Sequence, residues 1–452
     1  MLPGILVAGN ASHSGKTTTT LALIAVLRKL GLRLATGKVG PDFLDTGYLQ
    51  HLSAYPCANF DLWMLGEEGV IALAQRSRAC DFLLVEGAMG LFDGGSASSA
   101  NVAKILQLSV LLVLDVRGMA ESVAAMALGF LQTGLAQGLH FCGFLTTHVG
   151  SLAHQRMLNR VLLPLSTHLQ VPYLGGLCRD EAPVLAERHL GLVASFESPK
   201  LNEEQLCRWF EAQINIDYLR FILPKTSVVQ RDEQSQRRYP SAVCCHHWVR
   251  VAIAYDEAFF FCYADLPACL EELGARICFF SPLHDEGVPS CDGVYLPGGY
   301  PELHASRLAA NHSMLESLRH FVRAGQGIYG ECGGYLYLLE RLLDIENNEY
   351  PLLGLLPGTA ELRGKRVALG YREVVGDAHF FGKTVRARGH EFHYALRRES
   401  VSSNALWQVK DREGHRLGAE GVFVGKVAGS FIHLPPLGAL DFWRTWLTLL
   451  RQ

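Results

Sequence analysis

Short continuous runs of apolar residues, separated by helical patterns, dominate the first half of the chain. The clearest runs are residues 5–8, 82–85 and 110–114, and residues 18–30 and 121–131 between them have the pattern of helices. Unbroken apolar runs are typical of strands that helices cover on both faces of a parallel sheet. The sequence therefore predicts a doubly wound α/β domain that binds ligands at the carboxyl ends of its strands.

The most polar stretch of the chain, residues 230–240, interrupts this pattern (QRDEQSQRRYP). Beyond it the alternation starts again, with strands expected at 249–254, 277–280, 294–296 and 327–329 and helices at 267–273 and 313–324. A polar segment between two such patterns is typical of an interdomain linker. We predict two α/β domains, residues 1–235 and 248–445: a parallel-sheet phosphate-binding-loop domain followed by a second α/β domain.

The charge and cysteine content exclude several protein classes. Among 452 residues, 41 Lys and Arg balance 44 Asp and Glu, so nothing favours a nucleic-acid partner. The longest apolar stretch, around residues 110–116, is too short to span a bilayer, and no basic segment opens a signal peptide. Twelve scattered cysteines without a CxxC pair argue against a disulfide scaffold or a zinc ribbon. We expect a cytoplasmic protein without a membrane partner, and a homodimer stays open.

The first candidate site is a glycine-rich loop between a strand and a helix, residues 9–17 (GNASHSGKT). Small residues let backbone N–H groups point at a phosphate, and the helix N-terminus adds positive potential. Lys16 is expected to reach the outer phosphates, and Thr17 to coordinate Mg²⁺. The spacing is unusual, because five residues rather than four separate the two glycines. The predicted nucleotide-binding residues are Gly9, Ser14, Gly15, Lys16, Thr17 and Thr18.

Three acidic residues accompany this loop. Glu86 directly follows the apolar run 82–85, and Asp42 and Asp45 lie in a turn after another short strand. Each acid alone is common in solvated turns and caps. Together with Thr17 and the phosphate loop, they predict a magnesium–nucleotide site for ATP.

The second candidate site is a cysteine between a predicted strand and a helix, Cys332 in GECGG. Flanking glycines are typical of a nucleophile elbow, and we expect the helix N-terminus to lower the pKa of the thiol. The glycine turn at residues 296–300 (LPGGY), after a predicted strand, could offer backbone N–H groups to an oxyanion. His433 is a candidate base, although spacing alone does not select it among 18 histidines.

The other cysteines are interpreted as core residues, including those of the consecutive cluster 244–247 (CCHH), for which metal binding is disfavoured.

Several longer motifs resemble one enzyme family. GECGG with the downstream SFIH is similar to the class I glutamine amidotransferase domain of the cobyrinic acid type, and KVGPD and EGAMGLFDG are similar to the ATP-binding half of the same enzymes, whose fold is like that of dethiobiotin synthetase. Residues 256–259 (DEAF), 297–303 (PGGYPEL) and 388–394 (RGHEFHY) match as well. From about residue 4 to residue 433, the chain resembles the cobyrinic acid a,c-diamide synthase family.

The resemblance implies a two-site mechanism. Cys332 would attack the glutamine amide with His433 as base and Gly299 in the oxyanion hole. Ammonia would then amidate a carboxylate of a corrinoid polycarboxylate that ATP and Mg²⁺ have activated as an acyl phosphate. In this family the a and c side chains of cobyrinate are amidated, and hydrogenobyrinate and nickel-sirohydrochlorin are alternative rings. A non-catalytic ATPase switch with an inert amidotransferase domain is disfavoured, because the loop lacks the early Lys of such ATPases.

Five positions depart from the family pattern or remain open. Pro435 stands where relatives carry His, and where class I enzymes with a third triad member carry an acid, so we expect a poorly oriented His433. Thr147 replaces an Asn that could help to hold the nucleotide base, and Asn101 replaces a common Asp. Tyr48 and His51 are candidates to face a substrate carboxylate. A packed aromatic and a surface His are equally compatible with the sequence.

Overall fold

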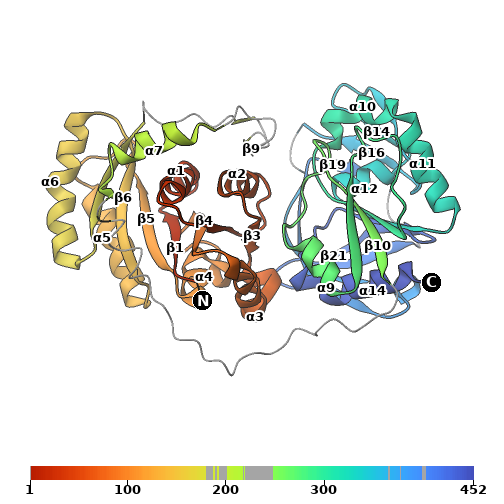
Figure 1. Ribbon diagram of the computed structural model, residues 1–452, viewed down its shortest axis with the longest axis horizontal. Helices are drawn as coiled ribbons and strands as arrows, with labels where there is room; N and C mark the ends of the chain where they lie inside the picture. Colours follow the sequence, from red (N-terminus) through yellow and green to blue (C-terminus); the bar gives the residue numbers. More distant parts are fainter. Residues whose placement is uncertain are drawn as a thin grey trace. The chain divides into compact units, whose positions relative to one another are not determined.

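The computed structural model divides the chain into two compact units, residues 1–235 and 236–452 (Figure 1). The residues that the structure describes are 2–179, 187–188, 191–192, 201–216, 218, 248–364, 367–376, 378–399 and 404–452. The predicted linker at 230–240 and the Cys/His cluster at 244–247 lie outside these described residues.

Parallel strands form the centre of the first unit, in the order β3-β2-β4-β1-β5-β6-β7. Every neighbouring pair in this sheet is parallel. The strands are β1 (Gly4–Gly9), β2 (Leu34–Val39), β3 (Cys57–Phe60), β4 (Phe82–Gly90), β5 (Ser109–Asp115), β6 (Phe141–Val149) and β7 (Tyr173–Cys178). Parallel pairing places the ends of β1, β2 and β4 at one edge, where the candidate phosphate site lies.

Helices cover both faces of this sheet, as the unbroken apolar strands require. In Figure 1, α1 (Lys16–Lys29) and α2 (Leu44–Ser53) lie on one side of the strands, and α3 (Leu62–Gln75) and α4 (Ser99–Leu106) on the other. α7 (Glu203–Glu211) packs along α1. The chain also forms α5 (Val123–Ala136) and α6 (Leu152–Leu169), which pack on each other, and the short hairpin of β8 (Glu187–Arg188) and β9 (Gly191–Leu192).

The second unit contains a mixed sheet in the order β11-β10-β12-β13-β22-β21-β20-β17-β18. The strands from β11 to β22 pair in parallel, and the remainder are antiparallel. The parallel strands are β10 (Val249–Ala254), β11 (Ala275–Phe280), β12 (Gly293–Leu296), β13 (Gly327–Glu331) and β22 (Val427–Ser430). The antiparallel extension comprises β17 (Ala368–Gly376), β18 (Val385–His393), β20 (Ala405–Lys410) and β21 (Arg416–Val424).

A four-stranded sheet and short helices complete this unit. The small sheet consists of β14 (Arg341–Leu343), β15 (Glu349–Pro351), β16 (Thr359–Leu362) and β19 (Ala395–Arg397). The helices are α9 (Leu266–Glu272), α10 (Ala305–Ala310), α11 (His312–Arg323), α12 (Gly333–Leu338), α13 (Ala378–Phe381) and α14 (Leu440–Leu450). Among the described residues, no helix is both long and apolar enough to cross a membrane.

The predicted α/β class is confirmed in both units, and two expectations need correction. Glu86 does not end its strand, because β4 continues to Gly90 and pairs there with Gly9 of β1. The antiparallel strands of the second unit were not predicted. Strand β10 occupies the predicted residues, whereas α5 begins two residues later than expected.

Candidate active sites

The phosphate loop joins β1 to α1, and its glycines are needed for steric reasons. Gly15 precedes the helix with φ +80°, a left-handed conformation that glycine adopts without strain. A Cβ atom on Gly9 would lie 2.1 Å from Ser14 Oγ. Lys16, Thr17 and Thr18 then occupy the first turn of α1, where backbone N–H groups and the helix dipole favour an anion. The structure thus places the predicted nucleotide-binding residues together in one loop and helix start.

Lys16 points back into this loop. Its Nζ donates hydrogen bonds to the Ala11 carbonyl oxygen at 2.8 Å and to Ser14 Oγ at 3.5 Å. Burial, assisted by the nearby charge of Lys38, lowers the pKa of Lys16 to about 8. The ammonium is therefore held by neutral oxygens that a phosphate group could replace with a charge-assisted contact.

Thr147 supports the loop from β6. Its Oγ1 donates to the Ser14 carbonyl oxygen at 2.7 Å, and a Cβ atom on Gly15 would lie 3.2 Å from its methyl group. From the other side, Asn10 Oδ1 accepts a hydrogen bond from the Asp115 amide at 2.9 Å. The residue that replaces the family Asn is thus a brace of the phosphate loop.

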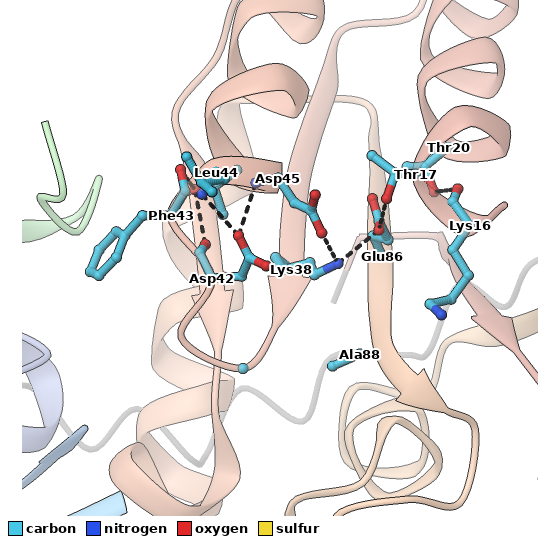
Figure 2. A network of polar contacts seen from close by, with 12 residues as sticks. Lys16, Thr17, Thr20, Lys38, Asp42, Phe43, Leu44, Asp45, Glu86 and Ala88 are labelled. Atoms are coloured by element: carbon cyan, nitrogen blue, oxygen red, sulfur yellow. Dashed lines mark hydrogen bonds and ion pairs between the residues drawn. The ribbon is translucent and has the colours of Figure 1, made fainter. Parts of the chain in front are cut away.

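A buried ion-pair network lies beside the loop (Figure 2). Lys38 and Glu86 are direct cross-strand neighbours on β2 and β4, and Lys38 Nζ donates to Glu86 Oε1 at 2.7 Å and also to Asp45 Oδ2. Thr17 Oγ1 donates to the same Glu86 oxygen at 2.7 Å. Sequence reasoning did not select Lys38 as a site residue, although it is the first residue of the KVGPD motif.

Burial and charge compete in this network. Burial raises the pKa of Glu86 to about 7, while the ammonium of Lys38 acts in the opposite direction. Burial alone would lower the pKa of Lys38, but the carboxylates of Asp45 and Glu86 outweigh it and raise that pKa. Glu86 Oε2 is buried without a hydrogen-bond partner among the described residues. An unpaired carboxylate oxygen next to the Thr17 hydroxyl suits a hard divalent cation such as Mg²⁺.

Asp42 is engaged differently from the other predicted metal ligands. Its Oδ1 accepts hydrogen bonds from the Leu44 amide at 2.8 Å and the Asp45 amide at 2.9 Å. Asn59 Nδ2 donates to the backbone oxygens of Gly40 and Asp42. Asp42 therefore shapes the turn that leads into α2. Across the described parts of the chain, one set of three His, Cys, Asp or Glu ligand atoms converges within 4.8 Å. It is the largely exposed group Asp411, Glu413 and His415.

Cys332 lies at the sharp turn between β13 and α12, as predicted. Its backbone adopts φ +49° and ψ −104°, a strained conformation for a residue with a side chain. The Cys332 amide donates to the Ser430 carbonyl oxygen at 2.7 Å, and a Cβ atom on Gly334 would lie 2.0 Å from the Leu296 oxygen. Close packing of α12 against β12 and β22 thus fixes the elbow.

The expected low pKa of the thiol is wrong for the resting site. Burial, followed by the carboxylate of Glu302, raises the pKa of Cys332 above its ordinary value. The six-residue helix α12 offers only a short dipole to oppose this effect. The thiol therefore needs a base to become a nucleophile.

His433 follows β22 and is held by the RGHEFHY motif on β18. The amide of each of His390 and His433 donates to the other's carbonyl oxygen, at 3.1 and 2.8 Å, and their rings stack 5.0 Å apart. A Cβ atom on Gly389 would lie 2.3 Å from the His433 oxygen. Burial, followed by the electrostatic interaction with His390, moves the pKa of His433 well below its ordinary value. The imidazole is thus neutral at rest and a weaker base than an exposed histidine.

The glycine turn after β12 brings the second site together. A Cβ atom on Gly298 would lie 2.4 Å from His433 Cε1, and one on Gly333 would lie 3.0 Å from the Gly299 nitrogen. Gly299 has no room for a side chain, because its Cβ atom would lie 2.1 Å from the Ala258 oxygen. Cys332, His433 and Gly299, chosen from distant parts of the sequence, therefore surround one small region.

Each of the two units matches a known domain family. The CobQ/CobB/MinD/ParA nucleotide binding domain matches residues 5–193, and the CobB/CobQ-like glutamine amidotransferase domain matches residues 250–439. The hydrogenobyrinate a,c-diamide synthase of Brucella abortus is 39% identical over 443 residues, which cover 96% of this chain and 98% of that protein. The chain belongs to the a,c-diamide synthase family. Two cobyrinate a,c-diamide synthases, from Syntrophotalea carbinolica and Dehalococcoides mccartyi, are 36% and 34% identical and cover 95% and 96% of this chain and 95% of each relative.

In this member of the a,c-diamide synthase family, three of the open positions have structural explanations. Asn101 Nδ2 donates to the carbonyl oxygens of Gly95 and Ser96, so it braces the turn before α4. Tyr48 is 1% exposed within the hydrophobic core of the first unit, which removes it as a substrate contact. His51 lies on the exposed side of α2.

Glu331 is the residue of the second site that sequence reasoning missed. It directly precedes Cys332 and is 1% exposed, and its Oε2 lies 3.8 Å from His433 Nδ1. The same oxygen accepts a hydrogen bond from Tyr295 OH at 2.8 Å, and Oε1 accepts one from the Leu434 amide at 3.2 Å. The signals in the sequence were an acid at the end of an otherwise apolar strand and its place in the GECGG motif.

Proposed function

We propose that the protein amidates the a and c carboxylates of cobyrinate in two successive ATP-dependent reactions, with glutamine or free ammonia as nitrogen donor. Residues 1–235 carry the ligase site and residues 248–445 the glutaminase site. The observation that carries the proposal is the convergence of Cys332, His433 and Gly299 on a chain that also holds a complete phosphate loop. The substrates are a corrinoid polycarboxylate, ATP and glutamine.

At the glutaminase site, the Cys332 thiol attacks the amide carbon of glutamine and His433 accepts the thiol proton. The oxyanion forms near the backbone N–H of Gly299. Collapse of the intermediate gives a thioester, and His433 returns the proton to the departing nitrogen, which leaves as ammonia. Water then hydrolyses the thioester, again with His433 as base, to give glutamate and the free thiol.

At the ligase site, the substrate carboxylate attacks the terminal phosphorus of ATP, which gives an acyl phosphate and ADP. Ammonia then attacks the acyl carbon and phosphate leaves. The N–H groups at the start of α1 and the Lys16 ammonium bind the phosphates, and Thr17 and Glu86 would hold Mg²⁺. When bound, Mg²⁺ neutralises charge on the phosphates. Lys38 lies between Glu86 and Asp45, where its positive charge keeps both carboxylates oriented.

Two variants test whether the glutaminase site and the ligase site carry separate reactions. Cys332→Ala should lose glutamine-dependent amidation and keep amidation with ammonium chloride, because carboxylate activation does not use the thiol. Lys16→Ala should lose both amidations, because it disables activation, and keep glutaminase activity. Loss of ammonia-dependent amidation in Cys332→Ala, or full ammonia-dependent amidation in Lys16→Ala, would contradict the proposal.

The mass of the reaction product shows which ring compound the protein amidates. Relatives at 39% identity carry the hydrogenobyrinate name, and relatives at 36% and 34% carry the cobyrinate name. Both acids are therefore assayed in parallel with Mg-ATP and glutamine. Two acid-to-amide shifts on cobyrinic acid support the proposal, whereas shifts confined to hydrogenobyrinic acid replace it with the metal-free ring. ATP hydrolysis without any carboxylate acceptor would indicate a switch ATPase instead.

A further inference from the structure

The carboxylate that normally orients a catalytic histidine is missing at position 435. Class I amidotransferases with a triad acid carry it two residues after the histidine, and this chain has Pro435 there. Proline offers neither a charge nor an N–H group. Nevertheless, His433 is 2% exposed and its ring is firmly stacked, so a neighbouring group can still fix its tautomer.

Glu331 lies where a carboxylate can orient the His433 ring. Its Oε2 lies 3.8 Å from His433 Nδ1, just beyond hydrogen-bond distance. The Cε1 and Nε2 atoms of the ring lie on the side of Gly298, where an added Cβ atom would be 2.4 and 3.2 Å from them. One nitrogen of His433 therefore faces Glu331, and the other faces the glycine turn and the thiol site.

The geometry points to Glu331 as the positioning residue of the glutaminase site, which substitutes for the absent acid at 435. This inference rests on the proposed function. A carboxylate that faces Nδ1 favours the tautomer with its proton on Nδ1, so Nε2 stays unprotonated and can take the proton of Cys332. It also stabilises the imidazolium that forms when the thiol attacks. Glu331 and Cys332 are consecutive, so a single strand end delivers both the nucleophile and the acid.

The surroundings hold Glu331 ready for this role. Tyr295 OH and the Leu434 amide donate to its two oxygens, which fixes the plane of the carboxylate. Burial raises the pKa of Glu331 to about 8, and the Tyr295 hydroxyl, the Leu434 amide and the Tyr329 hydroxyl oppose that rise. The other titratable groups near His433 are His390 and His393 on β18. His390 is neutral near pH 7, since burial lowers its pKa to about 3. Glutaminase activity should therefore increase as the pH rises through about 8, because Glu331 then becomes ionised.

The test compares glutaminase activity of the full chain across pH 6.5–9.5. Glu331→Gln keeps the size and the acceptor oxygen of the side chain but loses the charge. We expect kcat to fall about 10²-fold and the increase in activity near pH 8, the limb of the pH profile, to be lost. The KM for glutamine should be nearly unchanged. Glu420→Gln is the matched control, because that carboxylate accepts hydrogen bonds from Ser430 and the Phe431 amide. It should keep both kcat and the limb.

Tyr295→Phe provides a second, independent variant. It removes one donor from an intact carboxylate, so the limb should move to higher pH while the plateau kcat is kept. Three outcomes would each overturn the inference alone. They are a wild-type kcat and pH limb in Glu331→Gln, an equal loss of kcat in Glu331→Gln and Glu420→Gln, and an unchanged pH limb in Tyr295→Phe. Wild-type protein without glutaminase activity would overturn the proposed function as well, and ammonia-dependent amidation, expected unchanged in all three variants, separates the two failures.

Discussion

At the scale of single residues, the phosphate loop depends on a lysine that is charged only below a defined pH. Lys16 is 6% exposed and its hydrogen-bond acceptors are neutral, so burial lowers its pKa to about 8. A bound polyphosphate stabilises the ammonium, which means that nucleotide binding and protonation of Lys16 favour each other.

Affinity for ATP should therefore decline at alkaline pH. Between pH 7 and 8 the dissociation constant should change little, and at pH 9 it should be about tenfold higher, because most free protein then carries a neutral lysine. Equilibrium binding of a non-hydrolysable ATP analogue measures this dissociation constant. Lys16→Arg should give a flat profile, since Arg stays charged throughout. A constant dissociation constant up to pH 9.5 in the wild-type protein would contradict the assignment.

Gly9 should tolerate no side chain. A methyl group there would lie 2.1 Å from Ser14 Oγ and 3.1 Å from Lys16 Cδ, so the loop would have to move. Gly9→Ala should weaken ATP binding at least tenfold and lower amidation with either nitrogen donor, while glutaminase activity persists. Gly129→Ala is the control, because nothing lies within 4 Å of its added Cβ atom on α5. Equal ATP affinity in both variants would refute the steric argument.

At the scale of elements, a very short helix positions the thiol. α12 contains six residues and begins directly after Cys332, so its own hydrogen bonds cannot hold it in place. Contacts with β12 and β22 do so instead, and they rely on glycines that allow backbone to approach backbone. The rare backbone conformation of Cys332 is thus maintained by the packing around it.

Gly334→Ala should break this docking. Its added Cβ atom would lie 2.0 Å from the Leu296 oxygen, which is backbone and cannot swing away. We expect a loss of about 1–3 kcal/mol in the unfolding free energy of the second unit and a larger proportional loss of glutaminase activity. Denaturant unfolding and glutamine hydrolysis measure the two effects. Gly364→Ala, with nothing within 4 Å of its added Cβ atom, should change neither. Full glutaminase activity in Gly334→Ala would contradict the role of α12.

At the scale of the whole molecule, buried acids should make the stability of the second unit depend on pH. Burial raises the pKa of Glu331 to about 8 and that of Glu420 to about 7. In the unfolded chain both acids titrate near 4.5, so the folded second unit binds more protons at intermediate pH. Their contribution to stability is complete below about pH 4.5 and is lost as pH rises through 7 and 8.

The second unit should therefore unfold more easily at pH 9 than at pH 6. Urea unfolding at several pH values measures this, followed by the fluorescence of the buried Trp407, Trp443 and Trp446. Glu420→Gln should flatten the slope near pH 7, because that proton no longer titrates. An unfolding free energy that rises between pH 6 and pH 9 would contradict the prediction.

The sequence by itself determined the α/β class, the phosphate loop and the cysteine elbow, because each of these is local. An apolar run, a glycine at a positive φ and a thiol between a strand and a helix leave their signal within about ten residues. Cys332 and Lys16 were accessible to this reasoning. His433 and Gly299 were selected through the resemblance to a family, since spacing did not distinguish them.

Only the tertiary structure decided which side chains meet and in which state of charge. Lys38 joins Glu86 because β2 and β4 are neighbours, and Glu331 meets His433 because β13 pairs with β22, although about a hundred residues separate them. The high pKa of the Cys332 thiol follows from burial, which depends on how many elements cover a group. Strand order and burial are properties of the assembled fold, and no local pattern encodes them.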